Sequence, residues 1–135
     1  MEEKIGLDTS FWIYFLEENQ EYLREIRKVV DEIEAGRIEA VFSSIGLIEV
    51  LTGPKKFGNF ELAGKYQELI AHFPNHTIQG INEQIVEIAS DLRARYGIDT
   101  SDAVHLATAM DFGAQKFITN DRRLKKVKEI KVEIL

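Results

Sequence analysis

Four acidic residues stand at positions where a carboxylate could take part in chemistry. Asp8 directly follows the short apolar run KIGL, and Asp121 lies two residues after the similar run KFIT. Asp102 opens the helical segment DAVHLATA, and Glu49 is the one charged residue of the apolar stretch SSIGLIEVL. A carboxylate with apolar neighbours carries a large desolvation cost unless a metal ion or a salt bridge compensates it.

A shared cation would give these four acids a common role. Carboxylates that crowd together repel one another and raise each other's pKa values, and a hard divalent cation relieves that repulsion. Oxygen ligands without paired His or Cys favour Mg²⁺ or Mn²⁺ over zinc, and the chain has no cysteine at all. Such an ion can activate water and stabilise the charge that builds up on a phosphodiester.

Each acid also has an ordinary structural explanation. Asp is common in turns, which could account for Asp8 and Asp121. Asp102 could be a first-turn acid favoured by the helix dipole, with one of the two preceding hydroxyl residues as the cap. Glu49 could pair with an arginine. Convergence of the four side chains on one place would distinguish a metal site from these alternatives.

Strands that alternate with helices must position the acids. Short apolar runs predict strands at residues 4–8, 38–44, 76–81, 116–119 and 130–135. Helical spacing and capping residues predict helices at 10–36 with a break near Asn19–Gln20, and at 45–53, 59–73, 82–97 and 101–113. The segment GPKKFG is expected to be a loop, and 121–127 a turn or short helix.

This alternation favours a mostly parallel sheet covered by helices on both faces, a three-layer α/β/α domain. No repeat or linker divides the sequence, so residues 1–135 are predicted to form a single domain. In such sheets, ligands bind beyond the carboxyl ends of the strands. Parallel strands would bring Asp8 and Asp121 to that edge, and the helix that Asp102 opens could begin there too.

Composition limits the class of protein. Apolar residues make up 44% and charged residues 30%, which is typical of a globular domain. The net charge of −6 counts against a broad, sequence-independent grip on nucleic acid, but not against an enzyme that acts on it. No window approaches the length of a membrane span, and MEEKIGLD is unlike a secretory signal, so we expect no membrane attachment and a cytoplasmic location.

The residues around the acids resemble the signature of the PIN domain family. The matching segments are GLDTS at 6–10, SSIGLIEVL at 43–51, DAVHLATA at 102–109 and FITND at 117–121. They follow the family's order and spacing, and the resemblance extends over nearly the whole chain. The compact length is similar to that of the VapC-type toxins of toxin–antitoxin pairs.

The resemblance implies a PIN-like fold and an endoribonuclease that depends on Mg²⁺ or Mn²⁺ and hydrolyses RNA phosphodiester bonds. The implied metal-binding and catalytic residues are Asp8, Glu49, Asp102 and Asp121. Residues expected to shape the site and contact the substrate are Ser10, Thr119, Asn120 and Arg122. The implied partners are an RNA substrate, a cognate antitoxin that blocks the site, and a second copy of the chain in a homodimer.

Basic and aromatic residues supply further candidates. An RNA strand needs cations besides the metal, and Arg122 and Arg123 directly follow the last of the four acids. The aromatic residues at 11–15 are expected to lie in the core or in a subunit or antitoxin contact. His105 stands one helical turn after Asp102 and could face the site, although such a histidine is more often structural. Asp99 is interpreted as a solvated turn residue.

Other functions remain open from the sequence. The main alternative is a PIN-like scaffold that binds RNA or protein without cleaving it. A signalling receiver domain would need a lysine after its last strand, but IKVEIL ends the chain. A phosphatase of the haloacid dehalogenase type would need an Asp at position 10, where Ser10 stands.

Overall fold

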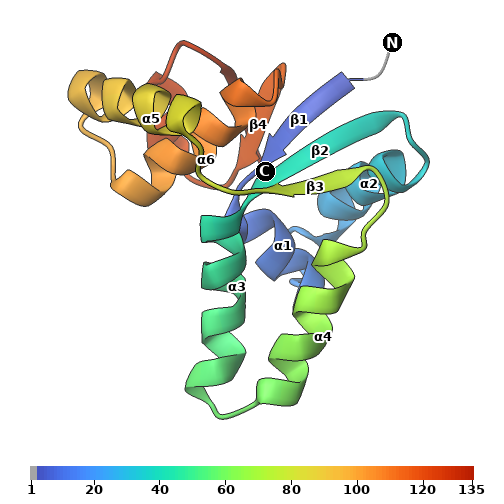
Figure 1. The fold of residues 1–135 in the computed structure, drawn as a ribbon. Helices are drawn as coiled ribbons and strands as arrows, with labels where there is room; N and C mark the ends of the chain where they lie inside the picture. The colour runs from blue at the N-terminus through green and yellow to red at the C-terminus, as the bar shows by residue number, and fades with distance from the viewer. Residues whose placement is uncertain (1–2) are drawn as a thin grey trace.

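The computed structural model describes residues 3–135. In chain order these residues form β1 (Glu3–Leu7), α1 (Thr9–Leu16), α2 (Leu23–Glu34), β2 (Ile38–Ser43), α3 (Ser44–Lys56), α4 (Phe60–Ala71), β3 (His76–Gln79), α5 (Glu83–Tyr96), α6 (Thr100–Asp111), β4 (Lys116–Thr119), the 3₁₀ helix η1 (Arg122–Lys126) and β5 (Lys131–Ile134). Figure 1 shows them in chain order from blue to red. Within this part of the chain, no helix has the length and apolar character needed to cross a bilayer.

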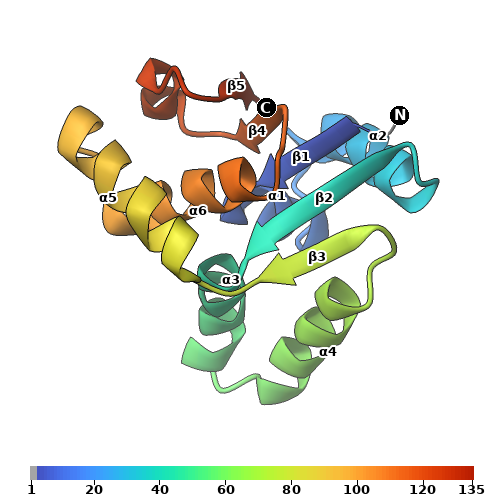
Figure 2. The ribbon, with the colours of Figure 1, turned by 45° about the horizontal axis from the view of Figure 1, so that its top comes forward.

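The five strands form one parallel sheet in the order β3-β2-β1-β4-β5 (Figure 2). From β1 the chain adds β2 and then β3 on one side, and later returns to add β4 and β5 on the other. Leu7 at the end of β1 pairs with Phe42 on one side and Ile118 on the other, so the carboxyl ends of three strands lie side by side. The winding reverses between β1 and β4, where sheets of this type bind ligands.

Helices cover both faces of the sheet, which confirms the predicted three-layer α/β/α arrangement. On one face, α6 packs over β1, β2 and β4, and α5 packs against α6, with Leu106 and Phe117 in the core between helices and sheet. On the other, α1, α2 and α4 pack over β1 and β2 around Phe11, Trp12 and Phe42. All five of these side chains are fully buried.

Gly6 sets the distance between α6 and the central strand. A Cβ atom added to Gly6 would lie 2.3 Å from the Cβ of Ala109 and 3.1 Å from the Phe117 ring. The absence of a side chain therefore lets α6 pack directly on β1. This packing fixes the helix that carries Asp102 relative to the strand that ends at Asp8.

Two helix boundaries test the sequence predictions. The predicted break near Asn19–Gln20 is confirmed, because α1 ends at Leu16 and α2 begins at Leu23. The predicted GPKKFG loop is wrong for its first four residues, since α3 continues through Pro54 to Lys56. Gly-Pro is a helix-breaking signal, but packing of α3 against α4 outweighs it here.

The two helices α3 and α4 form a hairpin that projects below the sheet (Figure 1). Gly58, with φ +73°, makes the turn, and Asn59 caps α4 by accepting a hydrogen bond from the backbone N–H of Leu62 at 3.1 Å. The hairpin carries Glu49 near the middle of α3 and the exposed side chains of Phe57 and Phe60 near its tip.

Candidate active site

Asp8 is held at the end of β1 by two hydrogen bonds. Its Oδ1 accepts from the backbone N–H of Thr9 at 2.8 Å, so Asp8 is the N-cap of α1. Its Oδ2 accepts from the hydroxyl of Thr119, at the end of β4, at 2.5 Å. The prediction that these two strands deliver residues to one edge is therefore confirmed. Thr119 is fully buried, and the hydrogen bond that its hydroxyl donates orients Asp8.

Glu49 lies near the middle of α3 and faces the same group of residues. Its Oε1 accepts from the Thr9 hydroxyl at 2.7 Å and lies 3.1 Å from Nε2 of His105. The alternative of an arginine partner is not what the structure shows: among residues 3–135 the ion-pair partner of Glu49 is His105. The hydrogen bond with His105 is the main cause that lowers the pKa of Glu49, against the opposing effect of burial.

Asp102 lies in the first turn of α6 among other acids. The helix begins one residue earlier than predicted, and its N-cap is Asp99 rather than a hydroxyl residue. Burial, followed by the negative charges of Asp8, Asp99 and Asp121, raises the pKa of Asp102 to about 6. Burial is the largest cause of the raised pKa, and the repulsion from the three carboxylates adds to it.

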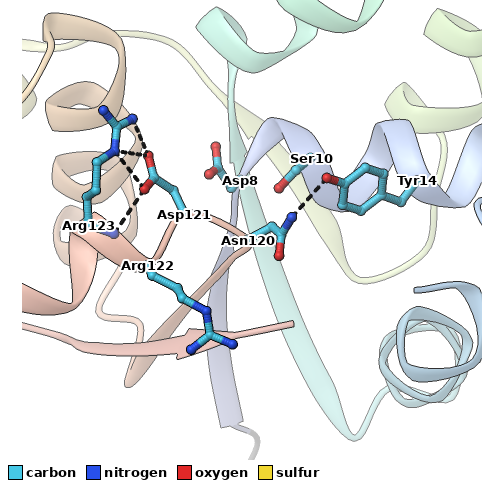
Figure 3. A pocket seen from close by; sticks show the side chains of 7 residues that line it. All are labelled: Asp8, Ser10, Tyr14, Asn120, Asp121, Arg122 and Arg123. Carbon is cyan, nitrogen blue, oxygen red and sulfur yellow. Dashed lines mark hydrogen bonds and ion pairs between the residues drawn. The ribbon is translucent and has the colours of Figure 1, made fainter. Parts of the chain in front are cut away.

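Asp121 is the N-cap of η1 and is engaged by an arginine. Arg123 donates to it with Nε at 3.0 Å from Oδ1 and with Nη2 at 2.6 Å from Oδ2. These hydrogen bonds lower the pKa of Asp121. Figure 3 shows the guanidinium of Arg123 against Asp121, with Asp8 on the other side of that carboxylate.

An open pocket of about 510 Å³ lies beyond the ends of β1 and β4. It is lined by Asp8, Ser10, Tyr14, Asn120, Asp121, Arg122 and Arg123 (Figure 3). Asp102 lines a smaller neighbouring cavity together with Arg123, and Glu49 lines a groove on the α3 side. The structure thus brings Asp8 and Asp121 into one pocket, with Asp102 within electrostatic reach and Glu49 joined through Thr9 and His105.

The donor set fits a hard divalent cation in kind, because all four groups are carboxylates and their mutual repulsion needs compensation. Their present rotamers do not form a ready-made cage: within the described chain, no three acidic or imidazole side chains are grouped as metal ligands. Arg123 occupies Asp121 instead, and Glu49 is bonded to Thr9 and His105. A cation bound by Asp121 would compete with Arg123 for that carboxylate.

The residues predicted to contact the substrate differ in burial and in their hydrogen-bond partners. Ser10 lines the pocket, and its buried Oγ has no hydrogen-bond partner in the part of the chain described. Asn120 donates from Nδ2 to the hydroxyl of Tyr14 at 3.0 Å, and the Tyr14 ring stacks on Tyr22. Arg122 is exposed at the pocket, and its guanidinium points away from Asp121 (Figure 3).

Sequence inspection missed the role of two hydroxyl residues. Thr9 bridges Glu49 and His105, and Ser101 lies 3.5 Å from Glu49. The one available signal for Thr9 is its place directly after Asp8, at the start of a helix. Nothing in the sequence reveals that residues 9, 49 and 105 meet, since the fold alone brings them together.

The sequence model of the PIN domain family matches residues 5–130. The chain belongs to the PIN domain family. Among curated protein sequences, none matches this chain.

Solved structures support the same fold. VapBC2 of Rickettsia felis, bound to a DNA fragment from its promoter, has a TM-score of 0.75 at 17% identity, covering 97% of this PIN domain and 98% of that chain. DNA-bound VapBC of Salmonella typhimurium also has a TM-score of 0.75, at 21% identity, covering 99% and 98%. VapC20 of Mycobacterium tuberculosis, a sarcin–ricin loop cleaving toxin, has a TM-score of 0.66 at 16% identity, covering 84% and 86%.

Proposed function

We propose that this PIN domain is an endoribonuclease that depends on Mg²⁺ or Mn²⁺ and is the toxin of a toxin–antitoxin pair acting in the cytoplasm. The observation that carries the proposal is the crowding of Asp8, Asp102 and Asp121 where the winding of the sheet reverses. PIN domains are generally nucleases that use divalent metals. The likeness to VapBC structures supports a toxin–antitoxin role, and the likeness to VapC20, a toxin that cleaves the sarcin–ricin loop, supports RNA as the substrate.

In this proposal Asp8, Glu49, Asp102 and Asp121 hold the cation. When bound, the cation lowers the pKa of a water molecule and stabilises negative charge on the scissile phosphate. Thr119 donates a hydrogen bond to Asp8, which holds this carboxylate in place in the metal-free protein. Arg123 neutralises Asp121 in the metal-free protein, and a cation held by Asp121 would leave this guanidinium available to an RNA phosphate.

Substrate would lie in the open pocket in front of these acids. The exposed Arg122 is placed to neutralise a phosphate, and the buried hydroxyl of Ser10 is an unused hydrogen-bonding group next to Asp8. Asn120 presents an amide at the pocket wall, held by Tyr14. These groups would orient the strand, whereas the carboxylates act on the phosphodiester.

An apolar groove between α1, α3 and α4 is the surface we propose for the antitoxin. It is lined by Ile13, Leu16, Val50, Phe57, Leu62 and Tyr66, together with Glu49 and other residues. Phe57 is 90% exposed and Phe60 is 65% exposed, which is unusual for aromatic side chains of an isolated domain. Because Glu49 also lines this groove, a partner seated there would reach the edge of the acidic site.

A homodimer would need a contact surface other than the groove that we propose for the antitoxin. Ile81 and Val86 are exposed near the start of α5 and border an apolar cavity that also includes Val104. We propose this surface for self-association, which sedimentation of the purified chain would test. A monomer at all concentrations would contradict it.

The test of the proposed activity is RNA cleavage by the purified chain with Mg²⁺, with Mn²⁺ and with a chelator. We expect cleavage only with a divalent ion, and its loss in Asp8→Asn and Asp102→Asn. Glu61→Gln, on the exposed face of α4, is the matched control and should cleave like the parent. Equal cleavage by the parent and both Asp variants would show that the assigned site is wrong. Metal binding without cleavage of any RNA would favour a binding scaffold instead.

A further inference from the structure

His105 is a buried imidazole whose ring orientation is fixed by packing. It is 3% exposed and lies on α6, one turn after Asp102. Its ring stacks on Phe42 of β2, with centroids 6.1 Å apart, and lies 6.4 Å from the Phe117 ring of β4. Gly46 leaves room for this arrangement, because a Cβ atom there would come within 2.8 Å of the imidazole and 2.4 Å of Phe42.

The polar edge of the ring faces the acids. Nε2 of His105 lies 3.1 Å from Glu49 Oε1, 3.1 Å from Thr9 Oγ1 and 3.8 Å from Asp8 Oδ1. Nδ1 is buried and finds no hydrogen-bond partner among residues 3–135. A lone pair on Nε2 would face a carboxylate, and a proton on Nδ1 would be an unsatisfied buried donor. Nε2 of His105 therefore carries a proton and donates it to Oε1 of Glu49.

The donors around Glu49 converge on one of its two oxygens. The Thr9 hydroxyl donates to Oε1, His105 donates to the same atom, and Ser101 approaches it at 3.5 Å. No hydrogen bond to Oε2 occurs in the described part of the chain. One oxygen is thus anchored, and the other is left for an external ligand.

We propose that His105 is a positioning residue that anchors Oε1 of Glu49, so that Oε2 is the oxygen available to the divalent cation. The cation itself rests on the proposed function, whereas the anchoring belongs to the metal-free protein. Glu49 is a half-exposed side chain on a projecting helix, and without a fixed donor it would sample several rotamers. Outer partners of this kind, which orient a metal ligand, affect metal affinity strongly when removed.

Two substitutions separate anchoring from packing. His105→Leu keeps an apolar side chain between the aromatic rings but removes the donor, and we expect its Mn²⁺ affinity to fall about 10- to 100-fold in calorimetry. His105→Gln restores an N–H donor and should recover most of that loss. Thr108→Val is the matched control, because Thr108 is buried on the same helix and donates only to the carbonyl of Val104. It should bind Mn²⁺ like the parent.

A second measurement uses the unsubstituted, metal-free protein and stays decisive if His105→Leu does not fold. Nitrogen-15 NMR should show a proton on Nε2 of His105 that is hydrogen-bonded to the Glu49 carboxylate. An Nε2 without a proton would overturn the inference. The inference would also be overturned if the parent bound Mn²⁺ and the His105→Leu variant bound it with the same affinity. A parent that binds no Mn²⁺ overturns the metal-dependent function, and the role of Oε2 with it.

Discussion

Asp102 shows most clearly how the acidic site costs stability. Its native pKa of about 6 lies above the ordinary value of 3.8 because it is partly buried among other acids. The native state therefore binds the proton more tightly than the unfolded state does. Its contribution to stability is present below about pH 4 and is lost as the pH rises to 6 and beyond.

Asp102→Asn should accordingly stabilise the metal-free protein at pH 7.5 by about 1 to 2 kcal/mol, discounted for solvent screening of a half-exposed group. At pH 4 the variant and the parent should unfold at the same urea concentration. Urea titrations at the two pH values check this. A variant that is less stable than the parent at pH 7.5 would mean that burial and the neighbouring acids do not raise the pKa of Asp102 in the native state.

Arg123 reduces the repulsion among the acids, because its guanidinium forms an ion pair with Asp121. Arg123→Gln should raise the Mn²⁺ affinity about threefold, because the ion no longer competes with a guanidinium and meets a more negative site. Its effect on stability should stay below about 1 kcal/mol, since the side chain is exposed. Calorimetric titration with Mn²⁺ measures the affinity, with Arg24→Gln on the exposed face of α2 as the control. Weaker binding in Arg123→Gln would contradict competition between the two cations.

The positions of the acids could be predicted at this scale, but their partners could not. Asp8 and Asp121 follow apolar runs, and parallel strands necessarily send such residues to one edge. The partners of Glu49 come from residues 9 and 105, and no local pattern links segments so far apart. The sequence places Arg123 two residues after Asp121, but it does not show whether the guanidinium faces this acid or the solvent.

The elements that carry the acids depend on one close approach between α6 and β1. Gly6→Ala would place a Cβ atom 2.3 Å from Ala109, so the helix must move away from the strand. We expect a loss of about 2 to 3 kcal/mol in the free energy of unfolding. Adding Ala109→Gly should recover part of it, as measured by urea denaturation.

Gly53→Ala on α3 is the control for this change, because a Cβ atom there meets nothing within 4 Å. It should stabilise the protein by roughly 0.5 to 1 kcal/mol through helix propensity. If Gly6→Ala were as harmless as Gly53→Ala, the packing that positions Asp102 would not be as described.

Element boundaries show what local signals can and cannot decide. The break between α1 and α2 was predictable because polar residues interrupt the apolar spacing at 17–21. The end of α3 was not, because Gly53 and Pro54 are local breakers whose effect is outweighed by packing against a helix later in the chain. Where packing against a distant element determines the end of a helix, the local sequence pattern predicts that end wrongly.

At the scale of the whole molecule, the acidic edge and the apolar groove are neighbouring features linked by Glu49. An antitoxin in the groove would therefore act beside the site. Phe57→Glu should weaken binding of a cognate antitoxin at least tenfold, since it removes an exposed anchor and adds a charge. Thermal stability should hardly change, because the side chain packs against little else. Surface plasmon resonance with the co-expressed partner measures this, and unchanged affinity would move the contact elsewhere.

The parallel sheet was predictable at this scale because strands and helices alternate along the chain. The strand order was not, since alternation alone does not say where β4 is added. That order nevertheless builds the candidate site, because placing β4 beside β1 brings Asp121 and Asp8 into one pocket.

The most direct test of this arrangement is a crystal structure of the protein soaked with Mn²⁺, with the ion located by its anomalous scattering. We expect one or two Mn²⁺ ions between Asp8, Asp102 and Asp121 at the carboxyl ends of β1 and β4, with Arg123 displaced from Asp121. An ion bound only elsewhere, or no ion while Arg123 keeps its contact, would contradict a metal site built from these acids.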